Sequence, residues 1–128
     1  MTDVWSSDEL NTINAAHELA ITTTRRDGTT RPDTPIWVVV TGGEVYVRTW
    51  HRRETGWFGE AVHTQQARIS VPGLTADATV EDLGADGAGP RADIDAAYRT
   101  KYGHSGDTSV GGMLTKAAAA STLRLRRR

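Results

Sequence analysis

Two consecutive segments of the 128-residue chain decide its fold: residues 19–28, LAITTTRRDG, and residues 34–49, TPIWVVVTGGEVYVRT. The first carries β-branched side chains in an alternating pattern, which is typical of a half-buried strand. In the second, residues 36–40 are apolar at every position, which predicts a strand buried on both faces. The Gly42-Gly43 pair predicts a two-residue hairpin turn into residues 44–50, where polarity alternates again. We expect these three strands to be antiparallel neighbours.

The rest of the chain predicts a small barrel with helices around it. Ser6 and Glu9 have the spacing of a capping box, which predicts a helix from an N-cap at Ser6 to about residue 17. Further helices are expected from residue 56 with Thr55 as N-cap, over residues 92–102 and over residues 110–120, and further strands over residues 67–71, 76–83 and 121–125. So few helices cannot cover both faces of a parallel sheet, and a closed antiparallel sheet leaves few unpaired edges. We therefore expect one mainly β (α+β) domain over residues 1–128, a six-stranded antiparallel split β-barrel with peripheral helices.

Composition argues for a small globular protein and against several classes of function. Hydrophobic residues make up 38% and charged residues 24% of the chain, and 15 basic against 16 acidic residues leave a formal net charge of −1. This balance argues against a nucleic-acid or membrane partner, because such proteins carry a strong basic excess. A chain without cysteine has neither disulfides nor thiolate metal sites. The N-terminal segment lacks the apolar core of a signal peptide, so we expect a cytoplasmic protein.

The strongest chemical signal is the segment RTWHRRETGW at residues 48–57. It gathers three arginines, a histidine, two hydroxyls and two tryptophans where a strand ends and a helix is expected to begin. A helix N-terminus presents free backbone N–H groups that attract phosphate, and arginine adds charge-assisted hydrogen bonds. Trp50 and Trp57 supply walls for an aromatic ligand. We therefore expect an anion site here; the alternative is a solvated basic loop beside packed tryptophans.

No residue pattern identifies a catalytic group. The chain has no Gly-x-Ser-x-Gly elbow, and residues 104–107 hold the triad residue types too close together in sequence to face one another. The four histidines lack metal-ligand spacing, so no metal site is expected. Asp93 and Asp95 are expected in the first turn of a helix, where acidic side chains favour the dipole. The catalytic residues are therefore unknown, and a cofactor would carry the chemistry of any reaction.

The two opening segments resemble the first half of an FMN-binding split barrel, the pyridoxamine-phosphate-oxidase-like superfamily that includes the deazaflavin-dependent nitroreductases. More closely, the chain is similar to a bacterial family known as domain of unknown function 2255. This similarity is carried by short matches whose order and spacing agree: Trp5 with Leu10, residues 46–48, residues 56–57, residues 97–102 and residues 121–125. The resemblance implies a homodimer that holds a flavin in grooves between its subunits.

By position, the resemblance also implies which residues bind the cofactor. The phosphate ligands would be Arg48, Thr49, Arg52, Arg53 and Thr55. Along the isoalloxazine ring would lie Thr22–Thr24 and Pro35–Trp37, among them Thr23 and Trp37. The implied function is that of a small oxidoreductase that binds FMN or a deazaflavin. Residues 59–61 are Gly, Glu and Ala, where superfamily members often have Lys and Asn. This departure favours the second hypothesis, a cofactor-free module on the same fold that binds a small anion or an aromatic metabolite.

Overall fold

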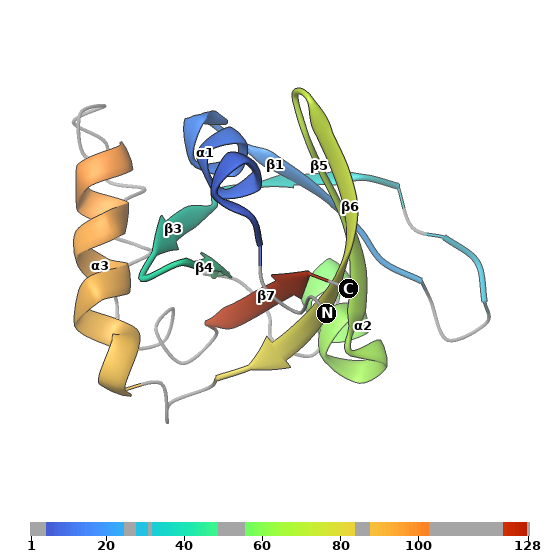
Figure 1. The fold of residues 1–128 in the computed structure, drawn as a ribbon. Helices are drawn as coiled ribbons and strands as arrows, with labels where there is room; N and C mark the ends of the chain where they lie inside the picture. The colour runs from blue at the N-terminus through green and yellow to red at the C-terminus, as the bar shows by residue number, and fades with distance from the viewer. Residues whose placement is uncertain are drawn as a thin grey trace.

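The architecture is a curled antiparallel half-barrel with helices on its outside (Figure 1). The computed structural model describes residues 5–24, 28–30, 32–48, 56–83, 88–102 and 122–127, and it describes residues 56–58 and 88–91 by their backbone only. The helices are α1 (Ser7–Ala15), α2 (Gly56–Thr64) and α3 (Ala88–Tyr102). The strands are β1 (Leu19–Thr22), β2 (Thr34–Ile36), β3 (Val39–Thr41), β4 (Glu44–Val47), β5 (Gln66–Val71), β6 (Leu74–Asp82) and β7 (Leu123–Arg127).

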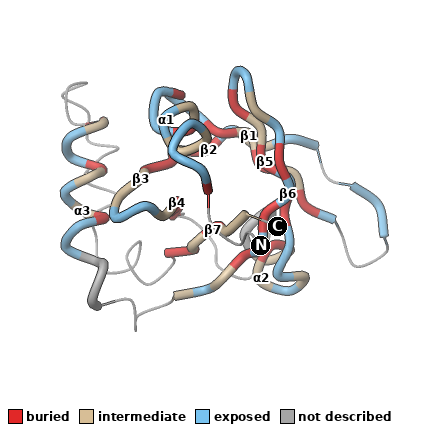
Figure 2. Tube along the Cα trace, in the orientation of Figure 1, coloured by how far each residue is buried: buried red, intermediate tan, exposed pale blue. Residues whose placement is uncertain are grey.

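The strands of the described chain form one sheet in the order β2-β1-β5-β6-β7-β4-β3, and every pairing in it is antiparallel. The sheet curls so that its inner face encloses the core, which Figure 2 shows as buried positions along the strands. Leu19, Ile21 and Ile69 are among the fully buried side chains of this face. The predicted mainly β split-barrel architecture is therefore confirmed, with seven strands in place of six.

The additional strand arises because the apolar run at residues 36–40 is not one strand. The run divides at Trp37 and Val38 into β2 and β3, which lie at opposite edges of the sheet. The Val38 N–H donates to the Tyr102 hydroxyl at 3.0 Å, and its carbonyl accepts from Lys101 Nζ at 2.8 Å. These bonds from α3 satisfy the Val38 backbone outside any strand ladder. The expected antiparallel pairings are found, because β1 pairs with β2 and β3 with β4, but the middle segment is two short strands and not one continuous strand.

The start of α1 confirms the predicted capping box. Ser6 Oγ accepts from the Glu9 N–H at 3.1 Å, and Glu9 Oε1 accepts from the Ser6 N–H at 2.9 Å. The buried Trp5 side chain donates from Nε1 to the Leu125 carbonyl at 2.8 Å and so joins this helix start to β7. The helix ends at Ala15, slightly earlier than expected. The hairpin turn between β3 and β4 is also confirmed, since both of its glycines have positive φ.

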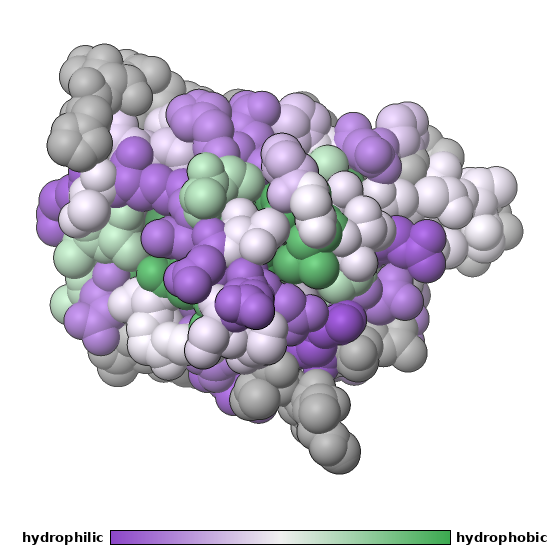
Figure 3. Space-filling view, turned by 45° about the horizontal axis from the view of Figure 1, so that its top comes forward, coloured by the Kyte–Doolittle hydropathy of each residue, from purple (hydrophilic) through white to green (hydrophobic). Residues whose placement is uncertain are grey.

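A second, smaller core lies between α3 and the outer face of β3 and β4. Its buried members are Val39, Tyr46, Ile94, Tyr98 and Tyr102. Figure 1 shows α3 standing against these strands at one end of the half-barrel. In the described part of the chain, no helix combines the length and the apolar character needed to cross a membrane. The face drawn in Figure 3 is largely hydrophilic, with hydrophobic residues in small patches.

Two boundaries in the C-terminal third differ from the prediction. Helix α3 begins at Ala88 rather than at residue 92, so Asp95 lies in the interior of the helix and not in its first turn. Strand β7 begins and ends two residues later than the expected 121–125. The helix expected over residues 110–120 falls outside the described residues.

Candidate functional site

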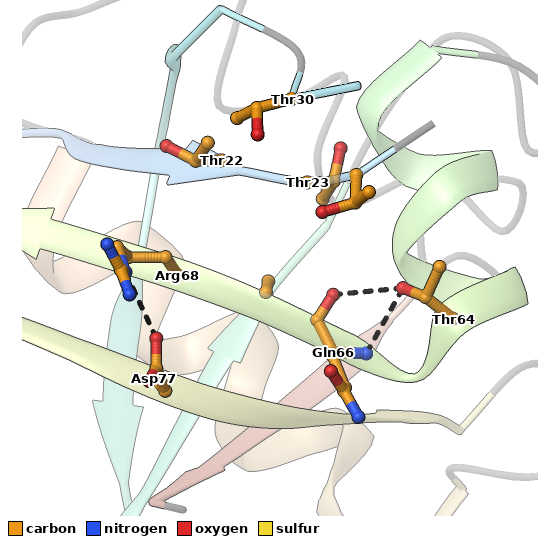
Figure 4. Close-up of a pocket in the computed structure, with 9 residues that line it drawn as sticks. Thr22, Thr23, Thr30, Thr64, Gln66, Arg68 and Asp77 are labelled. Carbon is orange, nitrogen blue, oxygen red and sulfur yellow. Dashed lines mark hydrogen bonds and ion pairs between the residues drawn. The ribbon is translucent and has the colours of Figure 1, made fainter. Parts of the chain in front are cut away.

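A polar pocket opens where the ends of β1 and α2 meet strands β5 and β6 (Figure 4). Its volume is about 530 Å³. The lining residues are Thr22, Thr23, Thr24, Thr30, Thr64, Gln66, Ala67, Arg68 and Asp77. Five of these nine residues are threonines, so the walls present hydroxyl groups that can both donate and accept hydrogen bonds. We call this site the threonine pocket.

The pairing of the strands explains why several of these side chains converge. Thr22 is paired with Arg68 on β5, and Arg68 is paired with Asp77 on β6. Directly paired residues project from the same face of a sheet, so the three form a row across the strands. Arg68 Nε donates to Asp77 Oδ1 at 3.1 Å, and both side chains are more than half exposed. An ion pair this exposed is weak, so a ligand can take over either partner at little cost.

The end of α2 supplies the opposite wall of the threonine pocket. Gln65 has a left-handed φ of 60°, and there the helix ends and the chain turns into β5. Thr64 Oγ1 lies 2.9 Å from the Glu60 carbonyl oxygen and 3.1 Å from that of Gln66, and it accepts from the Gln66 N–H at 3.3 Å. These bonds hold the Thr64 hydroxyl in place, and the exposed Gln66 side chain lines the wall beside it.

Thr23 is the residue of the threonine pocket that most directly indicates a ligand. Its side chain is 2% exposed and continues the buried row that Leu19 and Ile21 begin. Its Oγ1 has no hydrogen-bond partner among the described residues. A buried hydroxyl without a partner costs about 1–3 kcal/mol, and buried polar atoms in folded proteins are nearly always satisfied. The adjoining pocket has room for an atom that would satisfy it.

Arg48 lies inside the fold, between β4 and α3. Its Nη1 is 2.6 Å from Asp95 Oδ1, and its Nε donates to Thr122 Oγ1 at 2.9 Å. The guanidinium carbon lies 5.4 Å from the centre of the Tyr98 ring, and burial raises the pKa of that phenol, which therefore stays neutral. The Arg48 side chain is fully enclosed, whereas Asp95 keeps 16% of its exposure. The charge of Arg48 is thus balanced within the fold, and its role as a phosphate ligand stays a prediction.

Trp37 lies against α3 and not in the threonine pocket. Its ring stacks on that of Tyr102, with 4.1 Å between the ring centres and 4° between the planes. The Tyr102 hydroxyl lies 2.8 Å from the His17 carbonyl oxygen, and burial raises the pKa of Tyr102 to about 12. One face of the Trp37 ring is therefore covered. Of the residues predicted along the flavin ring, Thr22, Thr23 and Thr24 line the threonine pocket, whereas Trp37 lies at a different packing site.

The other predicted site residues are not described in their side chains. Thr49, Trp50, Arg52, Arg53 and Thr55 lie outside the described residues, and Trp57 lies in the first turn of α2, where only the backbone is described. The predicted start of a helix at residue 56 is confirmed. Over the ranges that the structure describes, no group of three or more His, Cys, Asp or Glu side chains is placed to hold a metal ion.

Three residues of this region were not predicted from the sequence: Arg68 and Asp77, which line the pocket, and Asp95, the partner of Arg48. Arg68 and Asp77 stand at equal distances in sequence from the Pro72-Gly73 turn, so the hairpin register was a usable signal for their pairing. Asp95 stands three positions before the buried Tyr98 on α3. An acidic residue next to the apolar, buried face of a helix indicates a cationic partner, because a charge that is buried must be paired.

Comparison with known protein families identifies one family whose sequence model matches this chain. The family described as "Uncharacterized protein conserved in bacteria (DUF2255)" matches residues 9–125. A search of curated proteins found no match.

Solved structures share the fold at low sequence identity. The heme storage protein HutZ from Vibrio cholerae is 12% identical, with a TM-score of 0.69 over 95% of this chain and 89% of its own. An FAD-binding protein from Mesorhizobium loti is 14% identical, with a TM-score of 0.63 over 100% of this chain and 94% of its own. An F420 reductase is 17% identical, with a TM-score of 0.56 over 92% of this chain and 90% of its own. At such identities the similarity shows the split-barrel fold alone.

Proposed function

The chain belongs to the DUF2255 family, and on that premise we propose that it binds a flavin or deazaflavin and acts as a small oxidoreductase. The observation that carries the proposal is the buried hydroxyl of Thr23 at the threonine pocket, which has no hydrogen-bond partner in the described part of the chain. The fold is shared with an FAD-binding protein and an F420 reductase, which supports a cofactor of this class. A bound flavin supplies hydride transfer, and the protein binds, orients and shields it.

The described residues fit the polar edge of a flavin ring. That edge carries both carbonyl oxygens and an N–H group, so it needs partners that can donate and accept. The hydroxyls of Thr23 and Thr24 can donate and accept, and the Thr22 hydroxyl, which donates to Asp33 Oδ1, can accept. The Gln66 amide adds one donor and one acceptor group. Arg68 lies in the same wall, where its positive charge would stabilise the negative charge that a flavin ring gains on reduction.

We assign the phosphate to the segment that follows β4. The proposed ligands there are Thr49, Arg52, Arg53 and Thr55, with Trp50 and Trp57 as aromatic walls and Arg48 as the residue that fixes the end of β4. Helix α2 has nine residues, about 13 Å, between this segment and the threonine pocket. An extended flavin mononucleotide can follow such a span. A homodimer would close the open side of the groove.

A cofactor-free binding module is the second candidate. None of the nine residues of the threonine pocket is aromatic, so no described side chain of this pocket stacks on a planar ring. Hydroxyls with one exposed ion pair also suit a small polar or anionic metabolite. The acidic Glu60 in α2 stands where a flavin phosphate would prefer a base.

Binding tests separate the two candidates. We would titrate the purified protein with FMN, riboflavin and a deazaflavin, and follow ligand fluorescence and thermal unfolding. A flavin at 100 times its Kd should stabilise the protein by about 2.7 kcal/mol. Exchange of Arg52 and Arg53 for glutamine should weaken FMN but not riboflavin, which lacks the phosphate. No response to any flavin, with stabilisation by a small anion instead, would establish the module and reject the oxidoreductase.

Thr23→Val tests the pocket itself, because it removes the hydroxyl and keeps the shape. Flavin affinity should fall about tenfold, whereas the free energy of unfolding should stay the same or rise by up to about 1 kcal/mol, since an unsatisfied buried group is removed. Thr75→Val makes the same chemical change at an exposed position of β6 outside the pocket, and it should leave binding unchanged. Equal affinities of the Thr23 and Thr75 variants would rule out this placement.

A further inference from the structure

A second groove lies between α3, β3 and the end of α1. Its volume is about 390 Å³. The lining residues are Asn14, Val39, Val40, Thr41, Asp93, Ala96, Ala97, Thr100 and Lys101. Apolar side chains, the polar Asn14, Thr41 and Thr100, and the charged Asp93 and Lys101 share its walls. The groove shares no residue with the threonine pocket, so an inference about it is independent of the flavin proposal.

Lys101 is the cationic residue of this groove. Its Nζ donates to the Val38 carbonyl at 2.8 Å and lies 5.4 Å from the centre of the Tyr102 ring. The ion pairs found over the described residues do not include it. Partial burial without an anionic partner disfavours the ammonium form and lowers the pKa of Lys101 to about 8.

We propose that Lys101 is an acylation site, whose amine accepts the acyl group of small acyl thioesters or acyl phosphates in this groove. The lone pair of the neutral Nζ attacks the carbonyl carbon, and a C–N bond forms while the C–S or C–O bond to the leaving group breaks. The nitrogen loses one proton, which the departing thiolate or phosphate takes up. The step consumes no oxidant, metal or cofactor.

The geometry supports this step in two ways. A neutral amine that donates one hydrogen to Val38 keeps its lone pair, and the groove gives an incoming carbonyl group room beside it. Ala96 and Ala97 offer an apolar surface to a short acyl chain. The hydroxyl of Thr100 and the amide of Asn14 line the same groove and can donate to the acyl oxygen.

The charged and titratable groups around the amine come from α3 and from the residues that follow α1. Asp93 lines the same groove two turns earlier on α3, and Tyr102 is the neighbouring phenol. On the far side of Tyr102, the His17 ring lies 5.6 Å away and Glu18 acts on the phenol through its charge. The residues of α1 and β3 in the groove are uncharged. Partial burial is thus what sets the reactivity of this amine.

Competitive labelling tests the proposal with few complications, because the chain has only two lysines, Lys101 and Lys116. Trace acetyl phosphate and, separately, S-acetyl-N-acetylcysteamine would be added to the folded protein and to the protein in urea. Peptide mass spectrometry would then give a rate for each lysine. At pH 8 about half of Lys101 is unprotonated, against under about 1% of an ordinary lysine. A less basic amine is a weaker nucleophile, so we expect Lys101 to react about tenfold faster folded than unfolded.

Two variants and a pH series complete the test. Lys101→Arg keeps a cationic donor for Val38 but carries no acylable amine, so it should lose the fast label, whereas Lys116→Arg should keep it. The rate at Lys101 should have its midpoint near pH 8. The two acyl donors distinguish the thioester source from the phosphate source. A Lys101 rate that is no higher in the folded chain than in urea, or a midpoint above pH 10, would overturn the assignment.

Discussion

The buried pair of Arg48 and Asp95 provides a sharp test of how this fold is held together. Arg48 Nη1 lies 2.6 Å from Asp95 Oδ1, with the arginine fully enclosed and the aspartate 16% exposed. Asp95→Ala would leave a guanidinium charge inside the protein with the neutral Thr122 as a remaining partner. Removal of one partner of a buried pair costs about 3–5 kcal/mol. We expect about 3 kcal/mol, the lower end, because the exposed edge of Asp95 lets water screen the pair.

Urea unfolding, followed by circular dichroism, measures this cost. With a slope of about 1.5 kcal/mol per molar urea, a loss of 3 kcal/mol lowers the midpoint by about 2 M. The Arg48→Met, Asp95→Leu double variant should recover most of the loss, since apolar side chains replace a buried pair at little cost. Asp77→Ala is the matched control: its pair with Arg68 is more than half exposed and should contribute under about 1 kcal/mol. A loss with Asp95→Ala as small as the control, or a double variant no better than the single one, would refute the reasoning.

Three further predictions concern stability. Because the pKa of Lys101 is about 8 in the fold and 10.5 ordinarily, the unfolded chain binds more protons between these values, and the free energy of unfolding should rise from pH 8 toward pH 10. After allowance for solvent screening, this rise in the free energy of unfolding is about 1–2 kcal/mol. In the Lys101→Met variant, urea unfolding between pH 8 and pH 10 should show no such rise. Tyr102→Phe leaves the buried Val38 N–H without its acceptor and should cost about 1–3 kcal/mol by the same measurement. Ser6→Ala removes the capping box and should lower the free energy of unfolding by about 1 kcal/mol in thermal melts.

The features of the fold that depend on neighbouring residues were predictable from the sequence. The capping box at Ser6 and the Gly42-Gly43 hairpin each depend on groups within a few positions, and both are confirmed. The prediction of one continuous strand over residues 36–40 was wrong because its outcome depends on residues far away in the sequence. Lys101 and Tyr102 take the Val38 backbone out of the sheet from more than 60 residues away, which no local pattern reveals.

The candidate site was predictable only where one strand carries it. Thr23 was implied by the family resemblance of the first strand, and it lines the threonine pocket. Arg68 and Asp77 enter the same pocket because β5 pairs with both β1 and β6. The first of these pairings joins strands that are not consecutive in the chain, and it follows from how the sheet curls. Sequence patterning fixes the alternation within each strand but leaves the order of the strands open.

The interior position of Arg48 changes how the predicted phosphate segment should be understood. An arginine that already neutralises Asp95 contributes little net charge to an anion, so any phosphate affinity must come from residues 49–55 and the N-terminus of α2. Arg48 instead fixes the position of the chain just before residues 49–55, because its side chain binds Thr122 and Asp95 of α3. On the other side, Thr64 and Gln65 fix where α2 ends beside the threonine pocket. If a ligand binds between the end of β4 and the end of α2, fewer protein groups must become ordered on binding, which lowers the entropic cost. In the proposed site, the buried ion pair would therefore position the ligand-binding segment, and the Thr23 hydroxyl, which has no partner among the described residues, would bind the ligand.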